Sequence, residues 1–247
     1  MNRSRYSLLA HRLLPFAAPI GEAAVEELLT LLPLNAASTV VDIGCGRAQL
    51  LGRLVKRFEL MATGVDIDKD ALELARKSVG ERVILVHQAA ADFQPEMCFD
   101  LAICIGSSHA LGGLVPTLTR LRSLVKPGGY MLLGEGYWKK EPEQAYLDAF
   151  GGSRDELLSF GGNVDCALTQ GLSPVWSAVS SERDGDHYEG LYRFAMSRFL
   201  TENPDDPEAE TFRQRSETWY NAYLRWGRET MGFTLLLFQT RGVNATA

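Results

Sequence analysis

The sequence has few cysteines and no cysteine pair. Its four cysteines, Cys45, Cys98, Cys104 and Cys166, are isolated from one another, and no two of them form a C-x-x-C motif. Neither a disulfide framework nor a cysteine-based metal site is therefore expected, and reduced thiols are typical of cytoplasmic proteins. We predict that the protein binds no metal and is located in the cytoplasm.

Long apolar runs and clusters of basic residues are also missing. No apolar stretch approaches the roughly 20 residues that a membrane-spanning helix needs, and Pro15 and Pro19 interrupt the apolar stretch after the basic N-terminus. Neither secretion nor membrane insertion is expected. The chain has 25 Lys and Arg residues against 31 Asp and Glu residues, a formal net charge of -6, and its basic residues are scattered. Nucleic acid is therefore not an expected partner.

The sequence does contain a regular alternation of apolar runs and amphipathic helical segments. Its 247 residues, 46% of them hydrophobic, suffice for one α/β domain with a full core. This alternation predicts a doubly wound α/β fold, in which helices cover both faces of a parallel sheet and ligands bind at the carboxyl ends of the strands. The predicted strands are 38–43, 60–66, 82–87, 99–105, 130–135, 174–180 and 232–240.

The two ends of the sequence depart from this alternation. Residues 1–20 are predicted to form an N-terminal arm outside the sheet. Residues 182–231, which are rich in aromatic side chains, are predicted to form a helical cap inserted between the last two strands. Residues 203–207, Asn-Pro-Asp-Asp-Pro, should divide this insertion into two helices, around 188–200 and 208–230. We expect the whole chain, 1–247, to be a single domain.

The rest of the chain is organised around residues 40–49. An apolar run containing Asp42 is followed by Gly44 and Gly46 and then by a segment with helical periodicity, which predicts a strand, a tight turn and a helix. Closely spaced glycines at such a turn allow a ligand to approach the backbone. A dinucleotide fingerprint requires a third glycine where Gln49 stands, so a nicotinamide-dependent oxidoreductase is not favoured.

Several stretches together resemble the class I S-adenosylmethionine-dependent methyltransferases. Residues 42–48 resemble motif I, in the D-x-G-C-G form typical of the small-molecule branch of that family. Residues 64–68 resemble motif II, in which an acid at the end of the second strand binds both ribose hydroxyls. The fourth strand, a histidine-containing loop and the turn before the fifth strand also fit the family, at 99–106, 107–111 and 124–129. The resemblance covers about residues 38–135.

This resemblance implies a seven-stranded, mostly parallel sheet with an antiparallel last strand, and methyl transfer from S-adenosyl-L-methionine to a small-molecule acceptor, with S-adenosyl-L-homocysteine as the product. Segments outside the core, such as residues 134–138 and 183–192, resemble a mostly uncharacterised bacterial group of methyltransferases. The implied cofactor-binding residues are Asp42, Gly44, Cys45, Gly46, Asp66, Ile67, Ala90, Ala91, Ile105 and Gly106.

Two positions depart from the family pattern. Ala48 replaces the third glycine of motif I, which is a mild change. Ala89 stands where the third strand of relatives ends in an acid that accepts the adenine amino group. Either Asp92 takes over that role, or the backbone of Ala90 and Ala91 holds the adenine with Phe93 packed nearby.

The candidate catalytic residues are His109 and Glu135. His109 lies in the loop that borders the sulfonium in relatives, and the alternative is a histidine that only packs or orients that loop. Glu135 ends the fifth strand and either orients an acceptor or serves as a structural carboxylate. The candidate acceptor-pocket residues are His11, Tyr137, Trp138, Tyr188 and Tyr192, and the alternative is that the aromatic residues of the insertion form core.

Other functions fit the sequence less well. Methyltransferases that act on nucleic acid bases usually carry an Asn/Asp-Pro-Pro-aromatic motif, whereas this chain has Ile105-Gly106-Ser107-Ser108 at that place. A metalloid methyltransferase would need clustered cysteines. A methyltransferase-like module that binds the cofactor without turnover is the main alternative, and the missing acid at Ala89 favours it. We expect a monomer or a homodimer with no membrane partner.

Overall fold

The computed structural model describes residues 1–241, except for the side chain of Phe150; residues 242–247 of the expected domain lie outside the described residues. The chain forms two compact units, which are described separately. Unit 1 contains residues 1–21, 136–159 and 180–233. Unit 2 contains residues 22–135 and 160–179 and the described residues from Thr234 onward.

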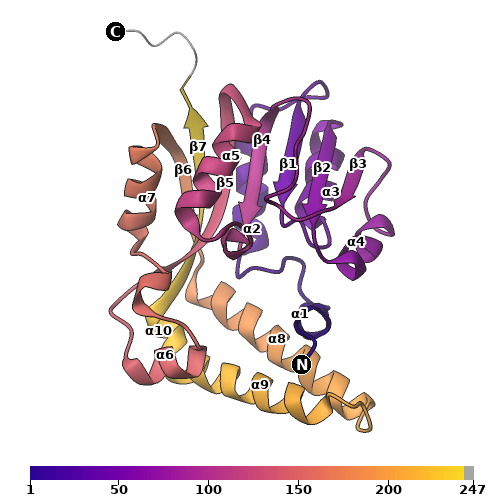
Figure 1. Ribbon diagram of the computed structural model, residues 1–247, viewed down its shortest axis with the longest axis vertical. Coiled ribbons are helices and arrows are strands. Elements are labelled where there is room, and N and C mark those ends of the chain that lie inside the picture. The colour runs from indigo at the N-terminus through magenta and orange to yellow at the C-terminus, as the bar shows by residue number, and fades with distance from the viewer. Residues whose placement is uncertain (242–247) are drawn as a thin grey trace. The chain divides into compact units, whose positions relative to one another are not determined.

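A seven-stranded sheet with the strand order β3-β2-β1-β4-β5-β7-β6 organises unit 2 (Figure 1). Strands β3, β2, β1, β4 and β5 pair in parallel, and β7 pairs with β6 in the antiparallel direction. The predicted fold class is therefore confirmed. The strands are β1 (Thr39–Ile43), β2 (Met61–Asp66), β3 (Val83–His87), β4 (Phe99–Ile105), β5 (Val125–Trp138), β6 (Leu172–Val179) and β7 (Met231–Thr240), of which the end of β5 and the start of β7 belong to unit 1.

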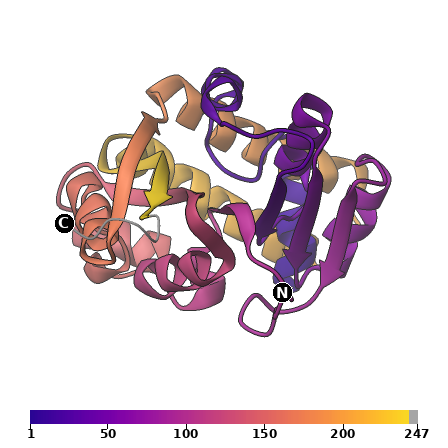
Figure 2. The same ribbon diagram turned by 90° about the horizontal axis from the view of Figure 1, so that it is seen from above.

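Helices cover both faces of this sheet (Figure 2). Alternate residues of a strand point to opposite faces, so Val41 and Ile43 of β1 lie on one face, where they share a buried cluster with Leu118 and Leu121. These leucines belong to α5, and Ala167 of α7 joins the same cluster. The helices of unit 2 are α2 (Glu22–Leu31), α3 (Gln49–Phe58), α4 (Lys69–Arg76), α5 (Leu114–Leu124) and α7 (Phe160–Thr169), with a 3₁₀ turn, η1 (Ser108–Leu111).

The Pro-Gly-Gly signal at residues 127–129, predicted to be a turn before the fifth strand, lies instead within β5. The register of the β4–β5 ladder shifts there, because Phe99 pairs with Val125 whereas Leu101 pairs with Tyr130. Gly128 has a φ of +79°, which a glycine adopts without strain. The strand therefore accommodates the extra residues as a bulge.

Unit 1 is mostly helical, and its helix α1 packs against α8 and α9. Tyr6 and Ala10 of α1 are buried in one cluster with Met196 and Phe199 of α8 and Phe212 of α9. The predicted break between the two cap helices is confirmed, since α8 ends at Glu202 and α9 begins at Ala209. The elements are α1 (Arg3–Ala10), α6 (Gln144–Phe150), η2 (Arg154–Glu156), α8 (Glu182–Glu202), α9 (Ala209–Ala222), the π-helical turn η3 (Tyr223–Gly227) and α10 (Arg228–Thr230).

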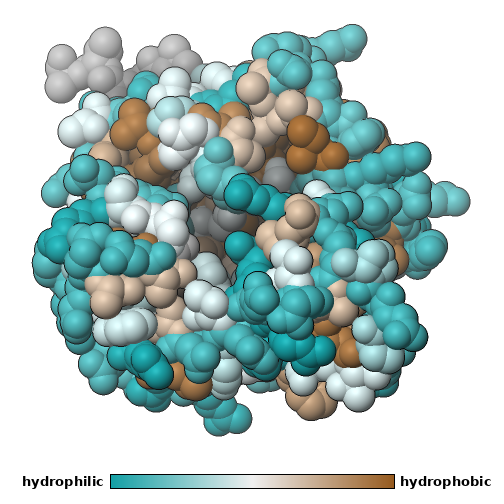
Figure 3. Space-filling model, turned by 60° about the horizontal axis from the view of Figure 1, so that its bottom comes forward, coloured by the Kyte–Doolittle hydropathy of each residue, from teal (hydrophilic) through white to brown (hydrophobic). Residues whose placement is uncertain are grey.

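Exposed hydrophobic side chains are scattered on the surface. On the face drawn in Figure 3, they form separate brown patches among hydrophilic residues. Scattered apolar residues of this kind are normal on a folded protein and do not by themselves indicate an interface. Among the described helices, none combines the length and the hydrophobicity that crossing a membrane requires.

Candidate functional site

The turn between β1 and α3 depends on two glycines for different reasons. Gly44 has a φ of +77°, and a Cβ added to it would lie 2.5 Å from both Cβ and Oγ of Ser107. Gly46 has a φ of +52°, and an added Cβ would meet no described atom within 4 Å. Gly44 therefore lets the loop after β4 approach closely, whereas Gly46 borders open space. Ala48, at the place of the third motif glycine, keeps a left-handed φ of +53°.

The carboxylate of Asp66, at the end of β2, joins this turn to the second predicted motif. Its Oδ2 accepts a hydrogen bond from the Gly46 N–H at 2.7 Å, and its Oδ1 accepts one from the Asp68 N–H at 2.8 Å. Each oxygen has a second lone pair that can accept from a hydroxyl group. The next side chain, Ile67, is 70% exposed, so an apolar surface beside Asp66 is accessible to a planar ring of a ligand.

Three ionisable groups near the turn, the buried Asp42 and Cys104 and the half-buried Cys45, have raised pKa values. Asp42 is 6% exposed, and burial together with the charge of Asp66 raises its pKa to about 7. Burial also raises the pKa of the Cys45 thiol, with Asp42 and Asp66 adding to the effect. The pKa of Cys104 is raised by burial and by Asp42 and Glu135. Both thiols are therefore protonated and poor nucleophiles at neutral pH.

The loop after β3 lies beside Ile67 and has its own turn. The ring of His87 is hydrogen-bonded through Nε2 to the Ile67 carbonyl at 3.0 Å. The Asp92 N–H donates to the Ala89 carbonyl at 3.0 Å, and the Asp92 side chain is exposed. Phe93 is buried, in the same cluster that Ala90 packs against. The loop thus has backbone groups near Ile67. Whether Asp92 or the backbone of Ala90 and Ala91 replaces the acid missing at Ala89 stays open.

The end of β4 completes the edge of the sheet. Gly106 has a φ of +66°, and its N–H donates to the Gly134 carbonyl at 2.8 Å, next to Glu135 at the end of the unit 2 part of β5. Glu135 is 8% exposed, whereas His109 lies exposed on η1. The structure therefore brings the predicted residues of β1, β2, β4 and β5 to one edge of the sheet. The roles of His109 and Glu135 stay predictions.

Comparisons with known proteins bear on this edge of the sheet. Residues 40–129 match the family model described as a methyltransferase domain. The chain is 27% identical to the uncharacterized protein YjhP of Escherichia coli over 222 residues, which cover 87% of this chain and 90% of YjhP. The solved structure of YjhP superposes with a TM-score of 0.89, at 26% identity, over 96% of this chain and 100% of that one.

Residues 40–129 form a methyltransferase domain, and almost the whole chain is similar to S-adenosylmethionine-dependent methyltransferases. A methyltransferase from Thiobacillus denitrificans, solved in complex with S-adenosylhomocysteine, is 25% identical with a TM-score of 0.89, over 98% of this chain and 100% of that one. A shorter match, 33% identical over 119 residues, is to trans-aconitate 2-methyltransferase of Paracidovorax citrulli and covers 47% of this chain and 46% of that one. The predicted family, including its similarity to an uncharacterised bacterial group, is confirmed.

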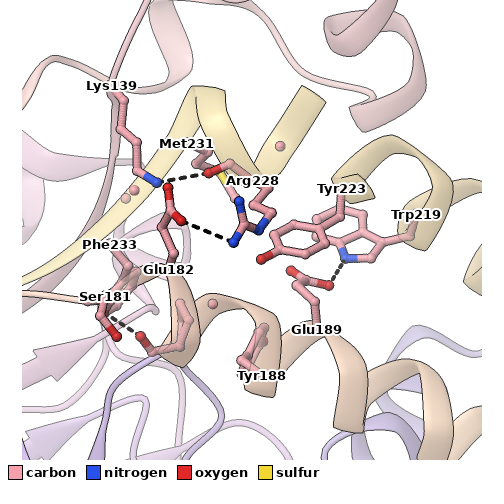
Figure 4. A pocket seen from close by; sticks show the side chains of 16 residues that line it. Lys139, Ser181, Glu182, Tyr188, Glu189, Trp219, Tyr223, Arg228, Met231 and Phe233 are labelled. Carbon is pink, nitrogen blue, oxygen red and sulfur yellow. Dashed lines mark hydrogen bonds and ion pairs between the residues drawn. The ribbon is translucent and has the colours of Figure 1, made fainter. Parts of the chain in front are cut away.

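The methyltransferase also has a pocket of about 160 Å³, lined by residues of unit 1 alone (Figure 4). Its walls are mainly aromatic and apolar, with Tyr188, Trp219 and Tyr223 on one side and Met231 and Phe233 on another. The remaining lining residues are Pro19, Gly136, Lys139, Ser180, Ser181, Glu182, Gly185, Glu189, Gly227, Arg228 and Gly232.

Of the five predicted acceptor-pocket residues, Tyr188 alone is among these lining residues. Its hydroxyl lies 2.8 Å from His11 Nε2, and the ring of Tyr192 contacts the His11 ring, so these two residues support Tyr188. Tyr137 packs against Gly232 of the wall, since a Cβ added there would lie 2.3 Å from its ring. Trp138 donates to the Arg154 carbonyl at 2.8 Å. Their part in acceptor binding stays a prediction.

Glu189, the buried carboxylate of this pocket, was not predicted as a site residue from the sequence. Glu189 is 5% exposed, and its Oε2 accepts a hydrogen bond from the Trp219 indole N–H at 2.7 Å. Burial raises the pKa of Glu189 to about 7, against the opposing effect of the Trp219 hydrogen bond. The available signal was its spacing, because Glu189 stands seven residues before the buried Met196 and so on the buried face of α8.

Proposed function

We propose that this methyltransferase transfers a methyl group from S-adenosyl-L-methionine to a small-molecule acceptor by in-line displacement. The observation that carries the proposal is the hydrogen bond between the Gly46 N–H and the Asp66 carboxylate, 2.7 Å long. It joins a glycine turn that borders open space to an acid with spare lone pairs, and this pairing suits a ligand with vicinal hydroxyls. The small-molecule acceptor named for the Paracidovorax relative adds support.

The residues at this edge fit the cofactor. In the proposal, the protein backbone of the turn at Gly44 and Gly46 contacts the cofactor, Asp66 binds the ribose hydroxyls and Ile67 covers the adenine. The exposed Ile67 side chain and the empty space beside Gly46 favour this assignment. The other proposed contacts are Asp42 and Cys45 under the turn, the backbone of Ala90 and Ala91 at the adenine, and Ile105 and Gly106 at the methionine part.

When bound, the cofactor supplies a methyl group on a positively charged sulfur. The chain's own contribution is to align the acceptor and to exclude water. The carboxylates of Asp42, Asp66 and Glu135 attract the positively charged cofactor to this region. We assign His109 as the group that takes a proton from an acceptor that arrives protonated, and Glu135 as a group that orients the acceptor.

We further propose that the enzyme is cytoplasmic, which its free thiols support, and is a monomer or a homodimer.

The test is methyl transfer itself. Purified protein is incubated with S-adenosylmethionine labelled in its methyl group and with panels of small amines, alcohols, phenols and carboxylic acids, and labelled product is measured together with S-adenosylhomocysteine. Labelled product from one class of small molecule supports the proposal. Cofactor binding without transfer to any of them would favour a binding module without turnover.

A further inference from the structure

Glu189 is a buried carboxylate that faces the unit 1 pocket with one oxygen unused. Its Oε2 accepts from Trp219, whereas among the described residues no hydrogen-bond donor contacts Oε1. Figure 4 shows the carboxylate between Tyr223, Tyr188 and Trp219, on the inner wall of the pocket. A carboxylate that is 5% exposed and lacks a counter-ion is destabilising when ionised, unless something else supplies the charge.

The basic residues of the pocket do not supply that charge. The Arg228 guanidinium is held by Asp186, at 2.9 and 3.1 Å, and by Glu182 at 3.0 Å. Lys139 Nζ donates to the Arg228 carbonyl at 2.9 Å. Within residues 1–241, no lysine or arginine forms an ion pair with Glu189. The wall around Glu189 is therefore acidic, although Lys139 and Arg228 also line the pocket.

The surrounding side chains suit a cation. Tyr188, Trp219 and Tyr223 line the pocket around Glu189, and the faces of such rings attract positively charged groups, Trp most strongly. Met231 and Phe233 offer apolar surface for the rest of a ligand. At the scale of one water-sized group per 10–15 Å³, a pocket of about 160 Å³ takes a ligand of about 11–16 non-hydrogen atoms.

We propose that the unit 1 pocket binds a small organic amine in its cationic form, with Glu189 as its counter-ion and the three aromatic rings as its walls. Within the proposed function, on which this assignment rests, the amine is the methyl acceptor: it loses its proton, its nitrogen then attacks the methyl group, and S-adenosylhomocysteine leaves. A ligand that is neutral and polar would instead need a protonated Glu189, which the test below distinguishes.

The direct test compares ligands that differ only in charge. Choline and its uncharged isostere 3,3-dimethylbutan-1-ol form one pair, and benzyltrimethylammonium and neopentylbenzene form a larger pair; binding is followed by Trp fluorescence and by calorimetry without cofactor. We expect at least one cation to bind about tenfold or more tightly than its isostere. If neither cation is preferred over its isostere, the proposal is overturned.

Two variants locate the effect. Glu189→Gln keeps an acceptor oxygen for Trp219 and removes the charge, so the preference for the cation should disappear. Glu217→Gln is the matched control, because Glu217 pairs with Arg193 on the same unit and does not line the pocket; it should bind as the wild type does. Circular dichroism and isostere binding show whether Glu189→Gln is folded. An unchanged cation preference in folded Glu189→Gln contradicts the proposal.

The same protein preparation separates this proposal from the proposed function. S-adenosylmethionine binding is measured by calorimetry beside the cation titrations. Cofactor binding without any cation preference contradicts the amine pocket alone. Cation binding that depends on Glu189, without cofactor binding, supports the pocket and contradicts the cofactor half of the proposed function.

Discussion

Gly44 and Gly46 share a left-handed backbone, yet a side chain at each would meet different surroundings. At Gly44 an added Cβ would lie 2.5 Å from Ser107, whereas at Gly46 it would point into open space. Gly44 is therefore required for the close approach of the loop after β4. Gly46 meets no such contact, and in the proposed function the open space beside it is left for the cofactor.

We predict that Gly44→Ala lowers the free energy of unfolding by about 2–4 kcal/mol, since the left-handed φ and the clash with Ser107 both oppose it. Gly46→Ala should lower it by only about 1–2 kcal/mol, from the left-handed backbone alone. Urea unfolding of the two variants measures the difference. Equal losses of stability would mean that the approach of Ser107 to the turn is not tight.

Glu189 should make the protein less stable as the pH rises. Its native pKa of about 7 lies above its ordinary value of 4.5, so the native state holds the proton more tightly than the unfolded chain. The stability it contributes is thus lost between these two values. We predict that Glu189→Gln is more stable than the wild type by about 2–3 kcal/mol near pH 8 and nearly equal near pH 4.

Thermal or urea unfolding at both pH values tests this prediction. The other ionisable groups around the pocket, Glu182, Asp186, Arg228 and Lys139, and His11 behind Tyr188, are present in both proteins and cancel in the comparison. A variant that is less stable than the wild type near pH 8 would show that Glu189 has a counter-charge in the native protein.

At the scale of elements, the start of α8 illustrates how a cap determines where a helix begins. The sequence predicted a helix around 188–200, yet α8 begins at Glu182. Ser181 is its N-cap: the Asp184 N–H donates to Ser181 Oγ at 3.2 Å, and Asp184 Oδ2 accepts from the Ser181 N–H at 2.9 Å. This reciprocal box adds residues 182–187 to the helix and places Glu182 and Gly185 on the pocket.

We predict that Ser181→Ala destabilises the protein by about 1 kcal/mol, because the Asp184 N–H in the first turn of α8 loses its acceptor. Ser197→Ala is the matched control, since Ser197 is exposed within the same helix and alanine favours the helix there. Melting temperatures of both variants measure how much the Ser181 cap contributes to stability. A loss in Ser197→Ala as large as that in Ser181→Ala would argue against the cap.

Elements with one dominant signal were predictable from sequence. The apolar runs located β1 to β4 to within about one residue. The glycine turn and Asp66, both predicted as cofactor contacts, lie together because they end neighbouring strands, and their binding role stays a prediction. The start of β5 was missed, since Pro127 and Gly128 signal a turn yet are accommodated as a bulge. Glu189 was missed because its partner Trp219 lies 30 residues away on another helix.

At the scale of the whole molecule, the proposed cofactor edge and the proposed amine pocket belong to different units. Unit 2 has the predicted cofactor edge, within one continuous stretch of the sequence. Unit 1 is assembled from residues 1–21, 136–159 and 180–233, so its pocket draws on segments that no local motif connects. A motif-based prediction therefore reaches the edge of unit 2 more readily than the pocket of unit 1. The single-domain arrangement with a cap at 182–231 stays a prediction.

Cofactor binding by Asp66 is tested most directly by calorimetric titration of the wild type and Asp66→Ala with S-adenosylmethionine and S-adenosylhomocysteine. Asp70→Ala, which removes an exposed carboxylate of α4, is the control. We predict that the wild type and the control bind both ligands and that Asp66→Ala binds them about 1–3 kcal/mol more weakly, the scale for unmet polar partners. An unchanged dissociation constant in Asp66→Ala, or a wild type that binds neither ligand, would contradict the account.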